Sequence, residues 1–276
     1  SYKVSIEDFV PERIKVSIEP SQKKSIPGEN ISFNLSAINF FGPPAADRKY
    51  ELEINYQSVP YASAKYPDFN FTYRGIDEQL GETSVYTGTT DDKGTAFIPI
   101  TIPNMNSNGI IRLRTRGAVF DETGRPVYNG AQVIVYPRNY FIGLKYTGRY
   151  YIAPGSQQQL HIAAVNKDDK PLSNFRAKVE IIRREWHSVL RRHQWSDVVR
   201  YVSEAREIVE KSEVVTIGDT PLSYSFMVNK TGDYIIRVSR EGEEGYNQIS
   251  FYSYSWITAD ITSFGVDPEA RVEIVT

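Results

Sequence analysis

The sequence predicts an all-β protein made of two tandem, seven-stranded antiparallel β-sandwiches, and three observations lead to this prediction. Val, Ile and Thr are frequent beside 19 Tyr and 13 Phe, and β-branched and aromatic side chains fill the half-buried face of a sheet well. Short runs in which apolar and polar residues alternate are separated by frequent turn signals. In addition, "PGENISFNLSAIN" at residues 27–39 returns as "PGSQQQLHIAAVN" at residues 154–166.

The repeat continues without a gap over residues 27–54 and 154–181, and apolar positions stay apolar. Further on, "NGIIRLR" at 108–114 resembles "GDYIIRVS" at 232–239. Self-similarity at a spacing of about 125 residues indicates two copies of one domain rather than one large fold. The repeated motif, for which we predict a structural role, comprises Pro27, Gly28, Phe33, Leu35, Asn39 and Pro44 in the first copy and Pro154, Gly155, Leu160, Ile162, Asn166 and Pro171 in the second.

Local patterns predict the elements of the first copy in order. Ile14, Val16 and Ile18 alternate with polar residues, as do apolar residues at 31–37 and 98–102, which predicts strands with one buried face. Pro-Gly predicts a turn before the repeated strand, because glycine accepts backbone angles that other residues resist. Further turns are expected at 43–44, 91–94, 122–126 and, in the second copy, 168–171.

We expect the first sandwich at residues 10–138 and the second at residues 139–259. Residues 1–9 are expected to be the end of a preceding domain or a linker, and residues 260–276 the first strand of a truncated third domain. Because the chain begins without an initiator Met, we expect a piece cut from a longer array, so that the sequence leaves open whether the full-length protein carries a targeting signal.

Residues 196–211, "SDVVRYVSEAREIVEK", leave two interpretations open. Their apolar residues lie near helical spacing and helix formers are common among them. A sandwich, however, needs strands or a long insertion at this position. Extended structure is favoured over helix by a narrow margin.

Composition argues against several classes of function. The formal net charge is −2, with Lys and Arg scattered among Asp and Glu, so a basic footprint for nucleic acid is missing. No run approaches the roughly 18 apolar residues of a membrane span. The absence of cysteine excludes disulfides, thiolate catalysis and Cys-ligated zinc.

No sequence pattern indicates catalysis. His187 and His193 lie six positions apart, which matches no metal-ligand motif, and His161 is expected to face solvent on the repeated strand. The chain contains neither a nucleophile elbow nor a phosphate-binding loop. We therefore predict no catalytic residue, no cofactor and no metal site.

The most suggestive surface lies around "REWHSVLRRHQW" at residues 184–195. Trp, Tyr and Arg carry much of the binding energy of protein interfaces, so contact with a neighbouring domain or a partner protein is one interpretation. Local packing between strands is the other. The residues concerned are Trp186, His187, Arg191, Arg192, Trp195 and Tyr201, with His193 beside them.

Several segments together resemble bacterial members of the alpha-2-macroglobulin family. They are "EDFVPERIKVSI" at 7–18, "SIPGENISFNLSAINFFGPPAADRKYELEI" at 25–54, "YYIAPGSQQQLHIAAVNKDDKPLSNFRAKVEIIRREW" at 150–186 and "TGDYIIRVS" at 231–239. The resemblance covers nearly the whole chain. It implies tandem macroglobulin-like sandwiches, which share the general architecture of fibronectin III and immunoglobulin domains.

The resemblance also implies a function. Members of the family entrap a protease after it cuts a bait segment, so this chain is expected to be a non-catalytic structural scaffold of such an inhibitor. The implied partners are neighbouring domains of the same polypeptide and, through the full-length protein, target proteases, with neither nucleic acid nor a membrane span. The implied location is periplasmic or extracellular, at the cell envelope, and a lipid anchor on the full-length protein is compatible with it.

Two features of the family are not expected within this chain. Many members carry a reactive thioester built from Cys and Gln, and a chain without cysteine cannot contain it. The polar stretch at residues 57–82 is only a weak candidate for a bait segment, since loops and an irregular strand are expected there.

Two other functions stay open. One is a tandem binding module of immunoglobulin-like or fibronectin-like domains in a surface adhesin or a glycan-processing protein, which a row of aromatic side chains on one sheet face would favour. The other is the accessory sandwich of an enzyme, which a cleft with clustered carboxylates of perturbed pKa would favour.

Overall fold

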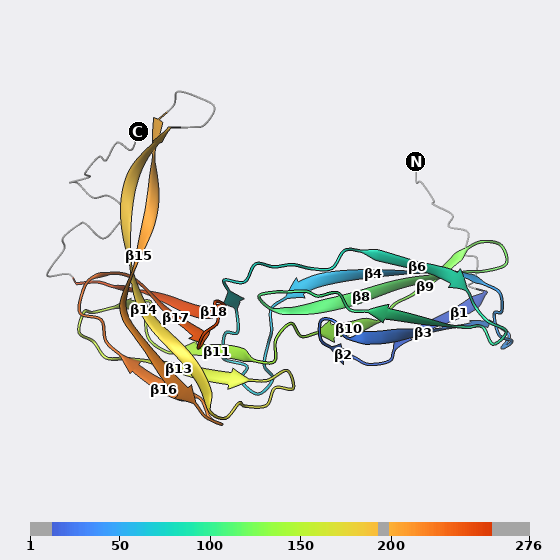
Figure 1. The fold of residues 1–276 in the computed structure, drawn as a ribbon, viewed down its shortest axis with the longest axis horizontal. Coiled ribbons are helices and arrows are strands. Elements are labelled where there is room, and N and C mark those ends of the chain that lie inside the picture. Colours follow the sequence, from blue (N-terminus) through green and yellow to red (C-terminus); the bar gives the residue numbers. More distant parts are fainter. Residues whose placement is uncertain (1–12, 193–198, 256–276) are drawn as a thin grey trace, which may run out of the picture. The chain divides into compact units, whose positions relative to one another are not determined.

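The computed structural model describes residues 13–192 and 199–255, so the predicted end segments 1–9 and 260–276 lie outside the described residues. All regular elements of the described part are strands, numbered β1 to β18 and drawn as arrows in Figure 1, and the predicted all-β class is confirmed. The same part contains no helix that could cross a membrane. The chain forms two compact units. The first consists of Ser1–Val59 and Asp77–Arg138, and the second consists of Pro60–Ile76 and Asn139–Thr276.

The first unit is a sandwich of two sheets, one of order β1-β3-β7 and the other of order β2-β10-β8-β4-β6 with β9 paired to β8. The strands pair antiparallel except for β2 and β10. The short strands β2 and β9 come in addition to the seven that the sequence predicts. The bounds are β1 Ile14–Pro20, β2 Lys24–Ser25, β3 Asn30–Asn39, β4 Lys49–Val59, β6 Ser84–Thr89, β7 Thr95–Thr101, β8 Ile110–Phe120, β9 Pro126–Asn129 and β10 Gln132–Val135.

The core of the first unit lies between its two sheets. Strand β1 alternates as predicted, with Ile14, Val16 and Ile18 buried and the residues between them exposed. Phe33 and Leu35 of the repeated motif are completely buried in the same core. Burying one such side chain stabilises the fold by roughly 1.5–3 kcal/mol, so the alternating faces hold the two sheets together.

The second unit is also a sandwich, with one sheet of order β11-β13-β16 and another of order β12-β18-β17-β14-β15. Strand β5 pairs with β18 at the edge of the larger sheet. Its core is separate from that of the first unit and contains Tyr234 and Phe251, both completely buried. The bounds are β5 Tyr73–Arg74, β11 Phe141–Tyr146, β12 Tyr151–Ile152, β13 Gln158–Val165, β14 Phe175–Arg192, β15 Val199–Ile217, β16 Leu222–Phe226, β17 Gly232–Arg240 and β18 Tyr246–Ser253.

The two sandwiches have the same sheet orders, strand for strand, with β1 corresponding to β11, β3 to β13 and β4 to β14. The repeated motif occupies equivalent places in both. Gly28 and Gly155 have φ angles of 81° and 75°, a conformation that favours glycine. Pro44 forms a bridge to the end of β3, and Pro171 forms the same bridge to the end of β13. Duplication of one domain therefore explains the sheet orders that the two units share.

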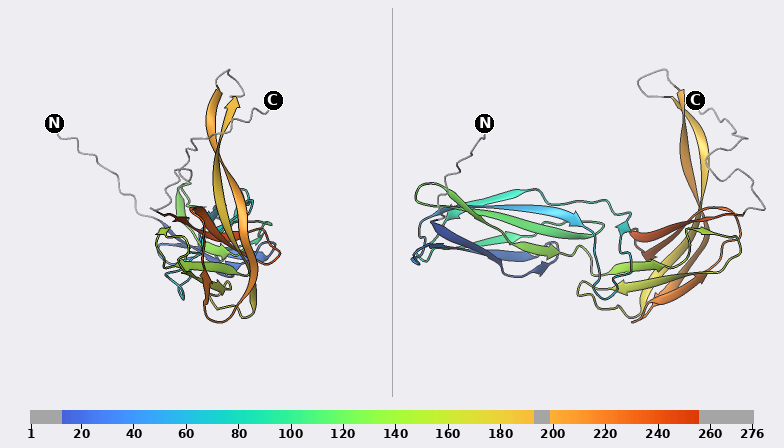
Figure 2. Two further views of the ribbon diagram at one scale, coloured as in Figure 1. Left: turned by 90° about the vertical axis from the view of Figure 1, so that its left-hand side faces the viewer. Right: turned by 180° about the vertical axis from the view of Figure 1, so that it is seen from behind.

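Strands β14 and β15 form a long hairpin that projects from the second sandwich (Figure 2). Residues 199–211 lie in β15, so the extended interpretation is correct for them, whereas residues 196–198 lie outside the described residues. Ile181 pairs with Lys211 but Ile182 pairs with Val209, which leaves a bulge at Glu210. A bulge shifts the strand alternation by one residue from that point on.

The compact units of the structure divide the chain differently from the predicted domains at one place. The sequence assigned all of residues 10–138 to the first sandwich, yet Pro60–Ile76 pack in the second unit. This segment leaves β4, contributes β5 to the edge of β18 and returns before β6. No sequence pattern indicates the excursion, because its anchors are single aromatic and polar side chains spaced irregularly along the chain.

Candidate interaction surface at the base of the long hairpin

The long hairpin carries the residues that the sequence singles out as a contact surface. Trp186 and His187 follow Arg184, the last residue of β14 that pairs with β17. Beyond that point β14 pairs only with β15. Trp186 keeps 41% of its surface exposed, and the imidazole of His187 is also exposed. The two side chains are thus available to a partner at the base of the hairpin.

Strand pairing brings further predicted residues together along the same hairpin. The backbone of Arg191 pairs with Arg200, and that of Leu190 with Tyr201. Arg192 is the last residue of β14. Trp195 and His193 lie outside the described residues.

A buried carboxylate organises the base of the hairpin. Asp233, at the start of β17, is only 2% exposed. It accepts hydrogen bonds from the guanidinium of Arg184 at 3.1 Å and from the indole Nε1 of Trp186 at 3.2 Å. A buried charge is tolerated when it is paired and hydrogen-bonded, so Asp233 fixes the orientation of both exposed-face side chains.

A pocket of about 850 Å³ opens beside this carboxylate. Its floor and walls come from the hairpin, the start of β17, the loop before β17, the turn that carries Pro154 of the repeated motif, and the end of the described chain. The residues that line it are Ala153, Pro154, Arg183, Arg184, Glu185, Trp186, His187, Asn229, Lys230, Thr231, Gly232, Asp233 and Ser255.

Several of the charges in this pocket pair with one another. Arg183 contacts Glu185 at 2.7 Å and Glu210 at 2.8 Å. Partial burial acts to lower the pKa of Arg183, but its hydrogen bonds to Glu210 and Glu185 raise it overall. In the part of the chain that the structure describes, no group of three or more His, Asp or Glu side chains could hold a metal ion. The arrangement suits recognition of a polypeptide through Trp and Arg.

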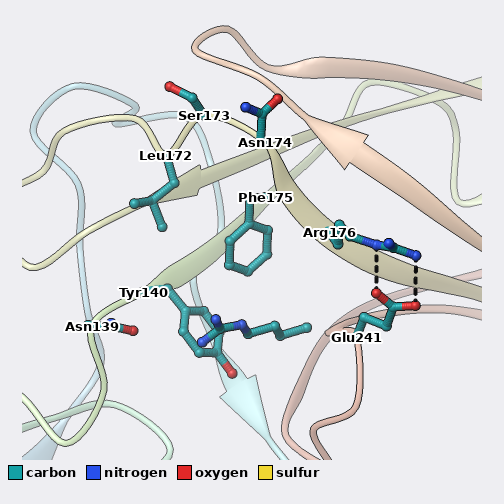
Figure 3. A pocket seen from close by; sticks show the side chains of 9 residues that line it. Asn139, Tyr140, Leu172, Ser173, Asn174, Phe175, Arg176 and Glu241 are labelled. Carbon is teal, nitrogen blue, oxygen red and sulfur yellow. Dashed lines mark hydrogen bonds and ion pairs between the residues drawn. The ribbon is translucent and has the colours of Figure 1, made fainter.

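A second pocket, of about 420 Å³, lies at the opposite end of β14 (Figure 3). Phe175 and Tyr140 pack with their rings 5.3 Å apart, and the guanidinium of Arg240 lies 5.0 Å from the Tyr140 ring. Beside them Arg176 and Glu241 form a bidentate ion pair, drawn as two dashed lines in Figure 3. No sequence pattern indicates this pocket, because its residues come from three separate segments.

The hydroxyl of Tyr140 is held neutral. Burial raises its pKa far above the usual range, and hydrogen bonds with Glu243 and Tyr73 raise it further. A phenol with so high a pKa cannot serve as a base or nucleophile at ordinary pH. Tyr140 joins elements of the sandwich through its hydrogen bonds with Tyr73 and Glu243.

Two adjacent phenylalanines form a third exposed feature, on the first unit. Phe40 and Phe41 are 75% and 95% exposed, with their rings edge to face at 5.7 Å. The Phe40 backbone N–H donates to the carbonyl of Arg13, just before β1. Large exposed apolar side chains mark contact surfaces. The signal in the sequence was "NFFGPP" at 39–44, two aromatic residues directly before a turn.

Two family models match consecutive parts of the chain. Residues 12–137 match the bacterial alpha-2-macroglobulin MG5 domain, and residues 143–256 match bacterial macroglobulin domain 6. The chain belongs to the bacterial alpha-2-macroglobulin family. The two matches agree with the two duplicated sandwiches, and the resemblance stated from the sequence is confirmed.

Curated relatives of this alpha-2-macroglobulin chain come from other bacteria. An alpha-2-macroglobulin homolog of Yersinia pestis is 25% identical over 90% of the chain, and an alpha-2-macroglobulin of Pasteurella multocida is 23% identical over 91%. The chain spans only 12% and 14% of the length of these two relatives.

Solved structures of alpha-2-macroglobulins share the fold. The native conformation of the Escherichia coli protein superposes with a TM-score of 0.60 at 17% identity, covering 90% of this chain and 16% of that one. The Salmonella protein reacted with methylamine gives 0.60 at 18% identity, covering 91% and 17%. At this level of identity the likeness shows the fold alone.

Proposed function

We propose that this chain is a structural scaffold of a bacterial protease trap and is itself non-catalytic. The observation that carries the proposal is the pair of duplicated sandwiches with identical sheet orders, each matched by one of two consecutively numbered macroglobulin domain models. Separate cores make each sandwich a rigid spacer. Holding other parts of a long polypeptide at a defined spacing requires such units and no reactive group.

Solved relatives support the trap as the setting for this scaffold. One structure is of the Escherichia coli alpha-2-macroglobulin activated by trypsin, and another is of the same protein activated by porcine elastase. We propose that the parent of this chain likewise meets proteases, with the reactive chemistry in other domains, since all 276 residues lack cysteine. A periplasmic or extracellular location follows from the same proposal.

The proposed partners of the chain are neighbouring domains of the same polypeptide. The exposed Trp186 and the pocket beside Asp233 form one proposed contact, and the exposed Phe40 and Phe41 form another. Target proteases are reached only through the full-length protein. No nucleic acid and no cofactor have a part in the proposal.

Incubating the purified chain with a panel of proteases tests the non-catalytic scaffold role. We expect no inhibition of any protease and slow cutting within residues 85–136, where β7, β8 and β10 belong to a packed sandwich. The readouts are residual protease activity on a small substrate and mass spectrometry of the fragments. Saturable inhibition by the chain alone would show that the inhibitory activity has been placed in the wrong part of the protein.

A second experiment tests the hairpin contact in the full-length parent. Trp186→Ala removes the exposed indole and one hydrogen bond to Asp233, whereas Val214→Ala changes an exposed residue farther along β15 and is the matched control. We expect the first variant to weaken trapping of trypsin and the control to leave it unchanged. Equal trapping by both variants would remove the hairpin base from the proposed contacts.

A further inference from the structure

The segment Pro60–Ile76, here called the strap, leaves the first unit after β4 and returns to it before β6. Between these points it packs in the second unit. The chain therefore passes between the two units three times, at 59–60, 76–77 and 138–139. A tandem scaffold requires only the last of these passages.

One end of the strap is held by a single carboxylate of the second sandwich. Asp169 accepts hydrogen bonds from the hydroxyls of Ser63 and Tyr61 and, at 2.8 Å, from the backbone N–H of Lys65. Asp169 has a φ of 61°, in the left-handed region, within the turn between β13 and β14. The N–H of Asp169 donates to the carbonyl of Asn166, so the turn that aims the carboxylate at the strap is itself braced.

Aromatic side chains hold the strap against β11, where Gly143 leaves space for one of the rings. The Tyr61 ring stacks on Phe141 of β11 at 3.9 Å, and Phe71 meets Tyr61 edge to face at 5.3 Å. Phe71 lies directly over Gly143 of β11, where an added Cβ would approach the ring to 2.5 Å. Tyr61 and Phe71 are 7% and 5% exposed. Only glycine at position 143 leaves room for the ring.

The far end of the strap joins the sheet of the second sandwich. Asn70 and Leu144 exchange two backbone hydrogen bonds of 2.9 Å. The side-chain amide of Asn247 donates to the carbonyl of Asn70 at 2.7 Å. The hydroxyl of Tyr73 donates to the carbonyl of Gly245 at 2.6 Å. These contacts place β5 against β18.

The strap has little structure of its own, so its attachment depends on these anchors. It contains one strand, of two residues, and most of its residues between the anchors are exposed. Ordering a segment of this length carries a large entropic cost, which the buried aromatics and hydrogen bonds must offset. Segments with few buried contacts open locally at a lower free energy than the core.

We propose that the strap is a releasable latch: docked, it completes the second sandwich, and released, it leaves residues 138–139 as the single connection between the two units. This device goes beyond the scaffold role, because it gives the pair of sandwiches two discrete states of attachment. Release removes Tyr73 of the strap from the core of the second unit, whereas the rest of that core, centred on Tyr234 and Phe251, stays folded in both states.

Hydrogen exchange of the full chain, read by mass spectrometry, tests the latch. Gly143→Val places a side chain where the Phe71 ring lies, and we expect exchange across residues 60–76 to rise about tenfold, which corresponds to about 1.4 kcal/mol of lost attachment. Exchange in β13 and β17 is expected to stay at the wild-type rate. The matched control is Gly218→Val, because a Cβ at Gly218 meets no atom within 4 Å.

Two results would overturn the proposal. If Gly143→Val leaves exchange across residues 60–76 unchanged, the packing of Phe71 over Gly143 does not hold the strap. If protection of β13 and β17 is lost together with that of the strap, the strap is an inseparable part of the core. Phe71→Ala provides a second variant without added bulk, and it must also raise strap exchange alone. In the double variant Phe71→Ala with Gly143→Ala, the small side chain replaces part of the lost ring, so we expect slower strap exchange than in Phe71→Ala.

Discussion

At the scale of residues, carboxylates and amides shape the turns that join the strands. Asp91 accepts hydrogen bonds from the backbone N–H groups of Lys93 and Thr95, and Asp121 accepts them from Thr123 and Arg125. Asn166 uses its amide oxygen in the same way toward residues 168 and 170. Asp and Asn favour such turns because the side chain bonds to the backbone two residues on.

Asp169 differs from these residues because its carboxylate faces another segment. Asp169→Asn keeps a side chain that tolerates the left-handed backbone but loses the charge and one acceptor. Hydrogen bonds to charged groups contribute about 1.5–3 kcal/mol, so we expect the second unit to lose on the order of 1 kcal/mol and trypsin to cut faster at Lys65. Urea unfolding and fragment mapping provide the measurement. Lys167→Asn, an exposed change in the same turn, is the control, and equal behaviour of the two variants would contradict the role of Asp169.

The stabilisation from Asp169 is expected to depend on pH. Partial burial acts to raise the pKa of this carboxyl, but the hydrogen bonds from Ser63, Lys65 and Tyr61 hold it below the usual value. Folding therefore favours the ionised form. The contribution is complete above the ordinary Asp pKa of about 3.9 and is lost as pH falls through the lowered value in the folded chain.

The measurement for this pH dependence is the free energy of unfolding of wild type and Asp169→Asn between about pH 7 and pH 3. The difference between the two proteins should be constant near neutral pH and should shrink on acidification. A difference that grows as pH falls would show that the pKa of Asp169 is raised in the folded chain rather than lowered.

At the scale of elements, the outer half of the long hairpin adds nothing to the sandwich core that the structure describes. The lower half of the hairpin contributes core residues from Phe175 to Ile182, whereas past Arg184 the described part of β14 pairs only with β15. A lone two-stranded ribbon is marginally stable in water, so its outer half is maintained for another reason. Contact with a neighbouring domain is the reason that we propose.

Shortening the hairpin tests this division of roles. Trp186 and Ala205 pair directly, so residues 187–204 can be replaced by Asn-Gly, which forms a tight hairpin turn. We expect the free energy of unfolding of the isolated chain to change by less than about 0.5 kcal/mol, as for surface changes away from buried groups. Chemical denaturation provides the measurement. A loss of several kcal/mol would mean that the outer hairpin stabilises the sandwich.

At the scale of the whole molecule, we expect the two separate cores to unfold as two stability units. Phe33 belongs to the core of the first unit and Phe251 to that of the second, and both are completely buried. Replacing a buried Phe by Ala costs about 3–5 kcal/mol. We expect Phe33→Ala to lower the unfolding transition of the first sandwich, and Phe251→Ala to lower that of the second and to raise exchange in the strap.

Hydrogen exchange measured segment by segment along the chain shows which sandwich loses protection in each of the two variants. Each serves as the control of the other, because the change in volume is the same and only the core differs. If Phe33→Ala removes protection from β13 and β17 as strongly as from β3 and β8, the chain unfolds as one cooperative body.

The sequence by itself determined the class of fold, the duplication and the family. Alternation at Ile14, Val16 and Ile18 and the repeated Pro-Gly turn are local properties, since a strand buries every second side chain and glycine accepts a positive φ. The same local rules identified Trp186 as a candidate contact, because an aromatic side chain beside clustered arginines is visible in the sequence without any knowledge of the fold.

Only the tertiary structure decided where the strap packs and how the hairpin base is organised. Tyr61, Phe71 and Tyr73 show no period that distinguishes them from loop residues, and their partners lie on β11, in the turn before β14 and near β18. In the sequence Asp233 is only a polar residue at the start of a strand. Its role becomes visible in the fold, where Arg184 and Trp186 donate hydrogen bonds to it. Contacts between segments far apart in sequence depend on the sheet order, and a strand pattern does not specify which strands become neighbours.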